Sequence, residues 1–334
     1  MELDVLLVLA GLGIGVVVGM TGMGGGALMT PVLVLFFGVP PLAAVSSDLV
    51  VSAVMKPVGG VVHLRRGTVD LRLVGLLCLG SVPAAFCGVL VSRALGSGVG
   101  VQEWTKTALG AALLLAAAGL ILRSYQSMVD RGRRAAQRRA GIVVVPPSSD
   151  GPFRLRPLPT IAVGVLGGLV VGMTSVGSGS LIIVALLVLY PTLSAAGLVG
   201  TDLVQAVPLV ASAALGHLLF GDFRLDLTTS LLLGCLPGVY LGARLSSRAP
   251  SGLVRRALAL VLLASGLKML GVPDLWMVTA LIAVVVVGPL LWMRARARHG
   301  LPPRPRILTQ AWVARRGDPV AASRPAELTT TSAS

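Results

Sequence analysis

Long apolar segments alternate with short polar or glycine-rich stretches along most of the 334-residue chain. These segments lie at about residues 4–19, 27–38, 42–63, 71–92, 105–122, 158–172, 179–190, 196–219, 225–243, 254–270 and 275–293. An apolar helix needs about 20 residues to span a bilayer, so the short pair that opens each half is marginal for a full crossing. The pattern predicts an all-α polytopic integral membrane protein. Each short pair forms either a helical hairpin broken at a glycine-rich turn, re-entrant or fully crossing, or one broken helix.

The second half of the chain repeats the first. The residues that recur 153 positions later are Gly11, Gly15, Gly19, Met20, Thr21, Gly24, Gly26 and Leu28, and those that recur 154 positions later include Asp48, His63, Gly67, Gly80 and Pro83. A duplicated apolar unit interrupted by glycines is typical of secondary transporters, whose substrate site lies between the repeats. We therefore expect a first transmembrane repeat, a basic cytoplasmic linker, a second repeat, an extra transmembrane helix and a basic disordered tail, at residues 1–122, 123–157, 158–270, 271–293 and 294–334.

The composition supports a membrane protein. Hydrophobic residues make up 55% of the chain and charged residues 12%, whereas soluble proteins carry about 25% charged residues. The formal net charge is +15, but the arginines cluster in the linker and the tail, beside apolar segments. Such clusters are typical of cytoplasmic loops that can also contact anionic lipid, so no nucleic-acid partner is expected. Cys78, Cys87 and Cys235 lie within apolar segments without metal-ligand spacing, so neither a metal nor a disulfide framework is predicted.

The arginines also predict the orientation in the cell membrane. With the linker in the cytoplasm and five passes in each half, the loops at Arg65 and Arg244 and the C-terminal tail fall in the cytoplasm, while Asp4 and Asp226 fall outside. Nearly every basic loop of this arrangement follows the positive-inside rule, with Arg93 and Lys106 as mild exceptions. An odd number of passes inverts one repeat relative to the other, so the two glycine-rich turns enter the membrane from opposite sides and can meet near its middle.

The glycine-rich turns carry the predicted substrate-binding residues. These are Thr21, Gly22, Gly24, Gly25 and Gly26 in the first turn, and Thr174, Ser175, Gly177, Ser178 and Gly179 in the second. Glycine lets a ligand approach the backbone closely, and the helix that follows each turn begins with unpaired N–H groups that favour an anion. The alternative is that the glycines only allow helices to pack closely. This structural role is preferred for Gly11, Gly15 and Gly19 and their copies, which are spaced four residues apart.

Ionisable residues inside the apolar segments form a second group of candidates. Asp48 and Asp202 lie early in equivalent segments, where a charge is costly and indicates a function such as proton coupling. The alternative is that each carboxylate caps its helix or pairs with a neighbouring Lys or His. Lys56, whose repeat counterpart is apolar, lies on the same helix face as Asp48 and either attracts an anion or neutralises that carboxylate. His63 and His217 are candidate gate residues, although a structural role is preferred for both.

Together these features resemble the TauE/SafE family of sulfite exporter-like membrane permeases. The resemblance covers about residues 4–270, and the segments that carry it are Gly19 to Leu28, Gly172 to Leu181, Ser46 to Leu49, Gly200 to Leu203 and His63 to Asp70. It implies export or uptake of small sulfur-containing anions, such as sulfite or organosulfonates, across the bacterial cell membrane. The family is broad, so no particular substrate follows. Asp48 and Asp202 stand where many members of the family carry an uncharged polar residue.

We therefore predict a secondary transporter that moves small anions by alternating access, without a cofactor. Its partners are a small anionic solute and the lipid bilayer, and a homo-oligomer is left open. Two alternatives come from other classes of protein. A passive anion channel would show flux without coupling to a proton gradient. An intramembrane enzyme would use the two aspartates and two histidines as acid–base groups, but it gives no reason for duplicated turns without charge.

Overall fold

The structure, a computed structural model, is described for residues 4–21, 25–65, 67, 69–94, 99–139, 155–190, 193, 195–220, 223–245 and 251–298. Within these residues it is all-helical apart from an isolated bridge between Gly177 and Gly179. The helices are α1 (Val5–Thr21), α2 (Gly26–Phe36), α3 (Pro41–Arg65), α4 (Leu71–Ala94), α5 (Val99–Arg139), α6 (Pro157–Thr174), α7 (Leu181–Leu189), α8 (Ala195–Phe220), α9 (Leu225–Leu245), α10 (Ser251–Met269) and α11 (Asp274–Arg298).

The helices coincide with the predicted apolar segments, because a backbone in lipid must satisfy its own hydrogen bonds and a helix does so within one segment. One difference concerns the expected linker. Helix α5 continues to Arg139, so the first part of that segment is helical. The rest of the linker up to residue 154 and the tail from residue 299 lie outside the described residues.

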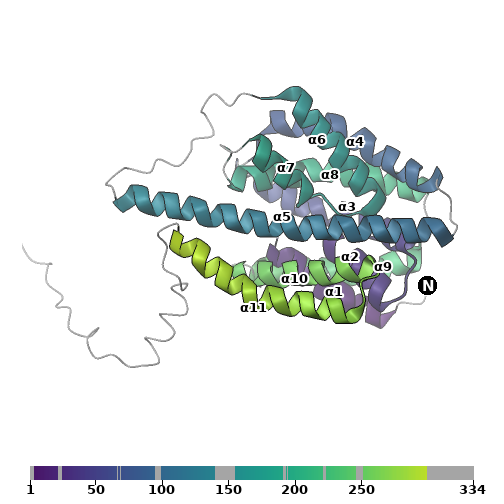
Figure 1. Cartoon of the computed structure of the whole chain (residues 1–334). Helices are drawn as coiled ribbons and strands as arrows, with labels where there is room; N and C mark the ends of the chain where they lie inside the picture. Colours follow the sequence, from purple (N-terminus) through teal and green to yellow (C-terminus); the bar gives the residue numbers. More distant parts are fainter. Residues whose placement is uncertain are drawn as a thin grey trace, which may run out of the picture. The chain divides into compact units, whose positions relative to one another are not determined.

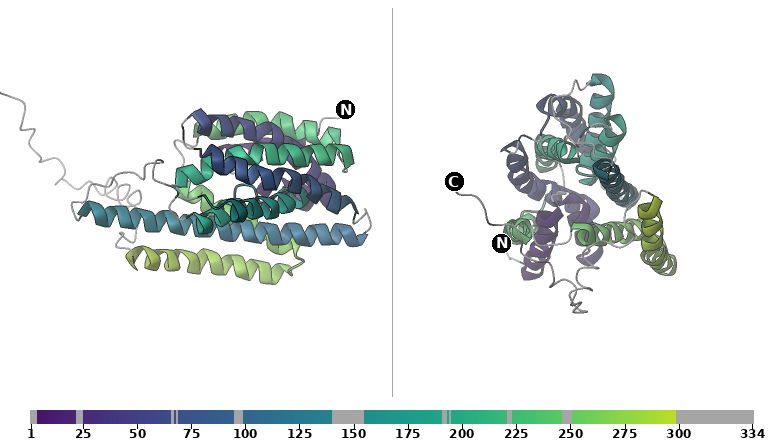
Figure 2. Two further views of the ribbon diagram at one scale, coloured as in Figure 1. Left: turned by 90° about the horizontal axis from the view of Figure 1, so that it is seen from above. Right: turned by 90° about the vertical axis from the view of Figure 1, so that its left-hand side faces the viewer.

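The chain forms two units. The first comprises residues 1–127 and 145–282, and the second comprises residues 128–144 and 283–334. The described residues of the second unit are the ends of α5 and α11. Most helices of the first unit run along one common direction, seen from the side in Figure 1 and nearly along their axes in the right view of Figure 2. The contacts that build the site all lie within the first unit.

The outer surface of the first unit is apolar. Six of the described helices contain stretches long and apolar enough to cross a membrane, at Leu71–Ala94, Gln102–Val129, Pro157–Thr174, Gly197–Phe220, Leu225–Gly242 and Asp274–Arg298. Large aliphatic side chains such as Leu79 and Leu166 are more than half exposed. Water does not favour such a surface, whereas lipid does. The chain is a multi-pass membrane protein.

Glycines bring helices from the two halves into backbone contact. A Cβ added at Gly15 of α1 would lie 2.5 Å from the carbonyl oxygen of Cys235 in α9, and one at Gly168 of α6 would lie 2.3 Å from that of Ser81 in α4. No side chain fits at either position, so the structural role predicted from the four-residue spacing is confirmed for these glycines. The first helix of each half therefore packs against the fourth helix of the other half.

Helices α3 and α8 carry the ionisable candidates, and they lie against each other. Ser46 near the start of α3 contacts His217 near the end of α8, with 2.7 Å between hydroxyl and ring nitrogen. Gly60, further along α3, lies next to Val204 near the start of α8. The two helices are therefore antiparallel.

Candidate functional site

The second glycine-rich turn, residues 175–180, interrupts the helical backbone between α6 and α7. Ser175 has φ 59°, and Gly177 and Gly179 have φ 131° and 99°. Among the described residues other than glycine, Ser175 alone has a positive φ. Its N–H donates to the carbonyl of Val171 at 2.7 Å and closes the end of α6, as expected for a left-handed residue after a helix. The turn thus exposes irregular backbone inside the bundle.

The first turn is described only where α2 begins. Gly22 and Gly24 lie outside the described residues, and Thr21 is the last residue of α1. A Cβ added at Gly26 would lie 2.3 Å from the carbonyl oxygen of Ser175. The start of α2 in the first half therefore touches the turn of the second half, and only glycine permits this approach.

The carboxylate of Asp48 is completely buried at this contact. It accepts hydrogen bonds from the hydroxyls of Thr30 on α2 at 2.8 Å, Ser175 at 2.6 Å and Ser52 on α3 at 3.3 Å. Hydrogen bonds to an ionised acceptor are stronger than neutral ones. Three hydroxyls from three segments thus stabilise the carboxylate and hold the second turn against α2 and α3.

Lys56 lies two turns after Asp48 on α3 and is only 6% exposed. Its ammonium donates a hydrogen bond to the hydroxyl of Ser178 in the second turn. It also interacts electrostatically with Asp202 and, less strongly, with Asp48. Helix α3 of the first half therefore holds the second turn at two points, Ser175 through a carboxylate and Ser178 through an ammonium.

Asp202 has a different setting, although it is also buried and occupies the same position in α8 as Asp48 in α3. The repeat counterparts of Thr30 and Ser52 are Ile183 and Ala206, which have no hydroxyl. The two acids are thus duplicated in the sequence, but the hydroxyls around the first are not.

The other predicted residues have structural contacts. Buried His217 lies 2.7 Å from the Ser46 hydroxyl through Nδ1 and 3.0 Å from the Gly172 carbonyl through Nε2. Because a carbonyl only accepts, Nε2 carries a proton, and the ring links α8 to α3 and α6. The hydroxyl of Thr174 donates within its own segment, to the Val170 carbonyl at 2.7 Å. His63 is partly exposed and lies about 22 Å along α3 from Asp48 by the rise of an α-helix.

The sequence-based prediction missed two residues that donate hydrogen bonds to Asp48, Thr30 and Ser52. Ser52 follows Asp48 by four residues on one helix, a spacing that brings side chains together and that could have indicated it. Thr30 carries no such signal, because it lies in an apolar segment and the repeat has isoleucine at the equivalent position.

A buried charged centre, built where a broken helical hairpin of one half meets helices of the other, is typical of membrane transport proteins. The chain belongs to the family described as Sulfite exporter TauE/SafE, whose sequence profile matches residues 7–269.

Similar proteins of known sequence carry transporter names. "Probable membrane transporter protein YjnA" of Bacillus subtilis (strain 168) is 35% identical over 274 residues, which cover 80% of this chain and 100% of that protein. "Probable membrane transporter protein YdhB" of the same organism is 23% identical over 266 residues, covering 79% and 99%. No solved structure matches the chain. The family and these names indicate a membrane transporter rather than an enzyme.

Proposed function

We propose that the chain is a secondary transporter of small anions, of the sulfite or organosulfonate type, that works by alternating access in the bacterial cell membrane. The observation that carries this proposal is the double attachment of the second turn to α3, Ser175 to Asp48 and Ser178 to Lys56. A turn held by a few polar contacts inside an apolar bundle can be released and bound again. The family name supports a sulfur-containing anion as the solute.

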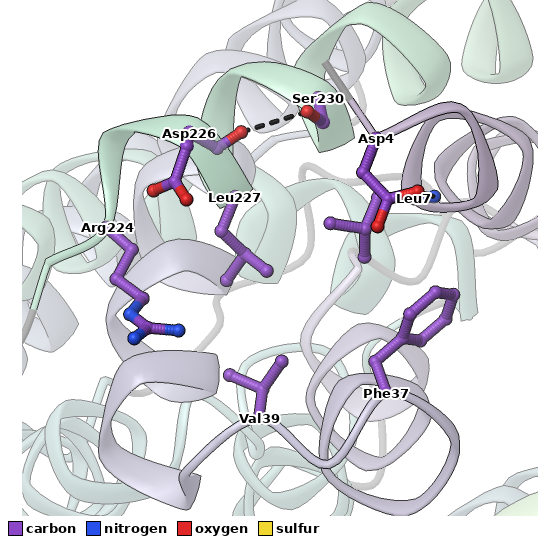
Figure 3. Close-up of a pocket in the computed structure, with 8 residues that line it drawn as sticks. All are labelled: Asp4, Leu7, Phe37, Val39, Arg224, Asp226, Leu227 and Ser230. Carbon is purple, nitrogen blue, oxygen red and sulfur yellow. Dashed lines mark hydrogen bonds between the residues drawn. The ribbon is translucent and has the colours of Figure 1, made fainter. Parts of the chain in front are cut away.

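The helix contacts support inverted repeats. Asp4 before α1 and Phe37 after α2 line one cavity (Figure 3). The open end of the α1–α2 hairpin, opposite its turn, therefore lies at the end of the bundle where α3 begins. Thr160 of α6 bonds Tyr190 after α7, and Gly80 of α4 packs near the start of the parallel helix α6. This second hairpin thus opens where α4 begins, at the far end of α3. Helix α3 has 25 residues, about 37 Å at the rise of an α-helix, so the hairpins open at opposite ends.

In the proposed site the solute lies beside Lys56, between the two turns. The ammonium supplies a positive charge, and the Ser178 hydroxyl together with N–H groups at Gly177 and Gly179 supplies donors. On the opposite side Gly25 has no side chain to meet the solute, whereas the Ser175 carbonyl fills the space beside Gly26. By the positive-inside rule, the linker and the tail face the cytoplasm in this proposal.

The charges of the site favour a proton as the coupling ion. Asp48, Asp202 and Lys56 have formal charges that sum to −1, so a bound anion would bring the total to −2 in a medium of low polarity. Taking up a proton on one carboxylate would offset the added charge. We therefore propose that the anion and a proton cross together.

Substitution of Lys56 by Gln tests the site. Loss of a charged hydrogen-bond donor costs about 1.5–3 kcal/mol, so sulfite flux into proteoliposomes at low sulfite should fall by about tenfold or more. Lys268→Gln is the matched control and should retain wild-type flux, because Lys268 lies at the surface in an exposed ion pair with Asp274. Wild-type flux in the Lys56 variant would remove this side chain from the site.

The same liposomes distinguish the transporter from a passive channel. With an imposed proton gradient, a coupled transporter accumulates sulfite above its external concentration, whereas a channel only equilibrates it. Equilibration without accumulation would favour the channel.

A further inference from the structure

The two hairpins end in different side chains at their open ends. Tyr190 follows α7, and its counterpart 153 residues earlier is Phe37, which follows α2. The two rings differ by one hydroxyl. The repeat therefore places a hydrogen-bonding group at the open end of one hairpin and an apolar ring at the open end of the other.

The open end of the α6–α7 hairpin is closed by Tyr190. This side chain is 3% exposed. Its hydroxyl contacts the hydroxyl of Thr160 and accepts a hydrogen bond from the N–H of Arg156 at 3.0 Å, both at the start of α6. Leu73, at the start of α4, lies fully buried in the same apolar cluster. Hydrogen bonds thus join the end of α7 to the start of α6.

The open end of the α1–α2 hairpin has a cavity instead. Phe37 and seven further residues line a space of about 460 Å³. In Figure 3 the side chains of Leu7, Leu227 and Val39 surround this space, and Arg224 and Asp226 lie to one side of it. Leu7 is the counterpart of Thr160 and Leu227 that of Leu73. Phe37 and Leu7 have no hydroxyls, so the bond that closes the other hairpin has no equivalent here.

We propose that Tyr190 is a gate residue that closes the α6–α7 end of the transport path, and that the cavity at Phe37 is the end open to water in this conformation. This inference rests on the proposed transport function. The Tyr190 hydroxyl joins the two helix ends by hydrogen bonds, so opening requires that the end of α7 separates from the start of α6. In the orientation proposed above, the Tyr190 gate faces the cytoplasm and the Phe37 cavity faces the outside.

A pair of equivalent cysteine reporters tests the gate. Leu227→Cys reports on the cavity and Leu73→Cys on the Tyr190 end, and each is labelled in vesicles of either orientation with a small membrane-impermeant methanethiosulfonate. Chains with only the native cysteines provide the background. The Leu227 reporter should react and the Leu73 reporter should be protected. Tyr190→Phe should raise the rate of labelling at the Leu73 reporter by about threefold to tenfold, the effect of losing a hydrogen bond, and leave the Leu227 reporter unchanged.

Thr160→Val provides a second test that leaves Tyr190 in place. It should also expose the Leu73 reporter. The matched control is Thr228→Val, because both threonines donate to the carbonyl four residues earlier, at 2.7 and 2.8 Å, and only Thr160 also contacts Tyr190. Thr228→Val should leave the Leu73 reporter protected.

The two proposals can fail separately. The gate would be overturned if the Leu73 reporter were labelled at the same rate with Tyr190 and with Tyr190→Phe. It would also be overturned if, with Tyr190 unchanged, the Leu73 reporter reacted as fast as the Leu227 reporter. Sulfite flux is measured in parallel on the chain without reporters. Absence of flux there would contradict the proposed function whatever the labelling shows, because labelling does not require transport.

Discussion

At the scale of single residues, two positions decide how the second turn meets the first half of the chain. Ser175 turns the backbone through a positive φ and directs its hydroxyl to Asp48. Gly26 leaves the space that the Ser175 carbonyl occupies. A buried carboxylate costs free energy unless it is hydrogen-bonded. The hydroxyls around Asp48 lower this cost, and Gly26 leaves the space that lets the Ser175 segment come close enough to supply one of them.

Replacement of Gly26 by Ala should separate the second turn from α2, because the added Cβ would lie 2.3 Å from the Ser175 carbonyl oxygen. Overpacking of this kind costs about 1–3 kcal/mol. We expect a lower unfolding temperature in detergent, and a lower sulfite flux because the second turn no longer lies against α2.

Gly25→Ala is the matched control for this prediction. Its Cβ would meet the nearest atom, Oδ1 of Asp48, at 3.5 Å, an ordinary contact. Its unfolding temperature should stay close to that of the unchanged protein. If the two substitutions lowered the unfolding temperature equally, the close approach of Gly26 to Ser175 would not contribute to stability.

At the scale of helices, close packing between α1 and α9 and between α4 and α6 joins the two halves. Helices in lipid gain little from burying apolar side chains, so contact between backbones at small residues becomes the main source of attraction. Gly234 and Gly242 of α9 face α1 as closely as Gly15 faces α9, with added Cβ atoms 2.0 and 2.1 Å from carbonyl oxygens. Both partners thus supply glycine to the interface.

Two glycines of α1 allow a direct test of this packing. Gly15 faces α9, whereas a Cβ at Gly13 would meet nothing within 4 Å. Gly15→Ala should destabilise the protein by about 1–3 kcal/mol. Gly13→Ala should be neutral or stabilise it by about 0.4–1 kcal/mol, because alanine loses less backbone entropy on folding. Thermal unfolding in the same detergent compares the two, and an equal loss of stability in both would contradict the packing described here.

At the scale of the whole chain, the duplicated unit and its orientation decide what the site can do. In the proposed arrangement the hairpins open at opposite ends of α3, and the second turn contacts α3 inside the bundle. In transporters with inverted repeats, closing one end and opening the other exposes a single site alternately to the two sides. The different residues at the two ends, Tyr190 and Phe37, make the ends unequal.

Cysteine labelling in intact cells tests the proposed topology. Arg65 at the end of α3 and Arg224 before α9 are both exposed. With inverted repeats and a cytoplasmic linker, an impermeant reagent added outside should label Arg224→Cys and should label Arg65→Cys only after the membrane is made permeable. Labelling of both positions from the same side would contradict five membrane crossings in each half, whether the short hairpins cross fully or re-enter.

Much of the fold could be predicted from the sequence, because it depends on local properties. Apolar runs form helices in lipid wherever they occur, so the predicted segments agree with helices such as α4 and α9 within a few residues. Four-residue spacing places Gly11 and Gly15 on one face of α1, and their role in packing followed from that spacing. The end of α5 was harder to predict, because an amphipathic, arginine-rich continuation carries no apolar signal.

What the sequence by itself determined is the helical membrane protein, its duplication and the presence of Asp48, Lys56 and Asp202 inside apolar segments. Only the tertiary structure decided which groups these charges meet. Thr30 and Ser175 are 145 residues apart in the chain and 2.8 Å apart in the structure, and Lys56 bonds Ser178 in the other half. Helical spacing relates side chains within a few turns of one helix, whereas contacts between the halves depend on how α2, α3 and the second turn pack together.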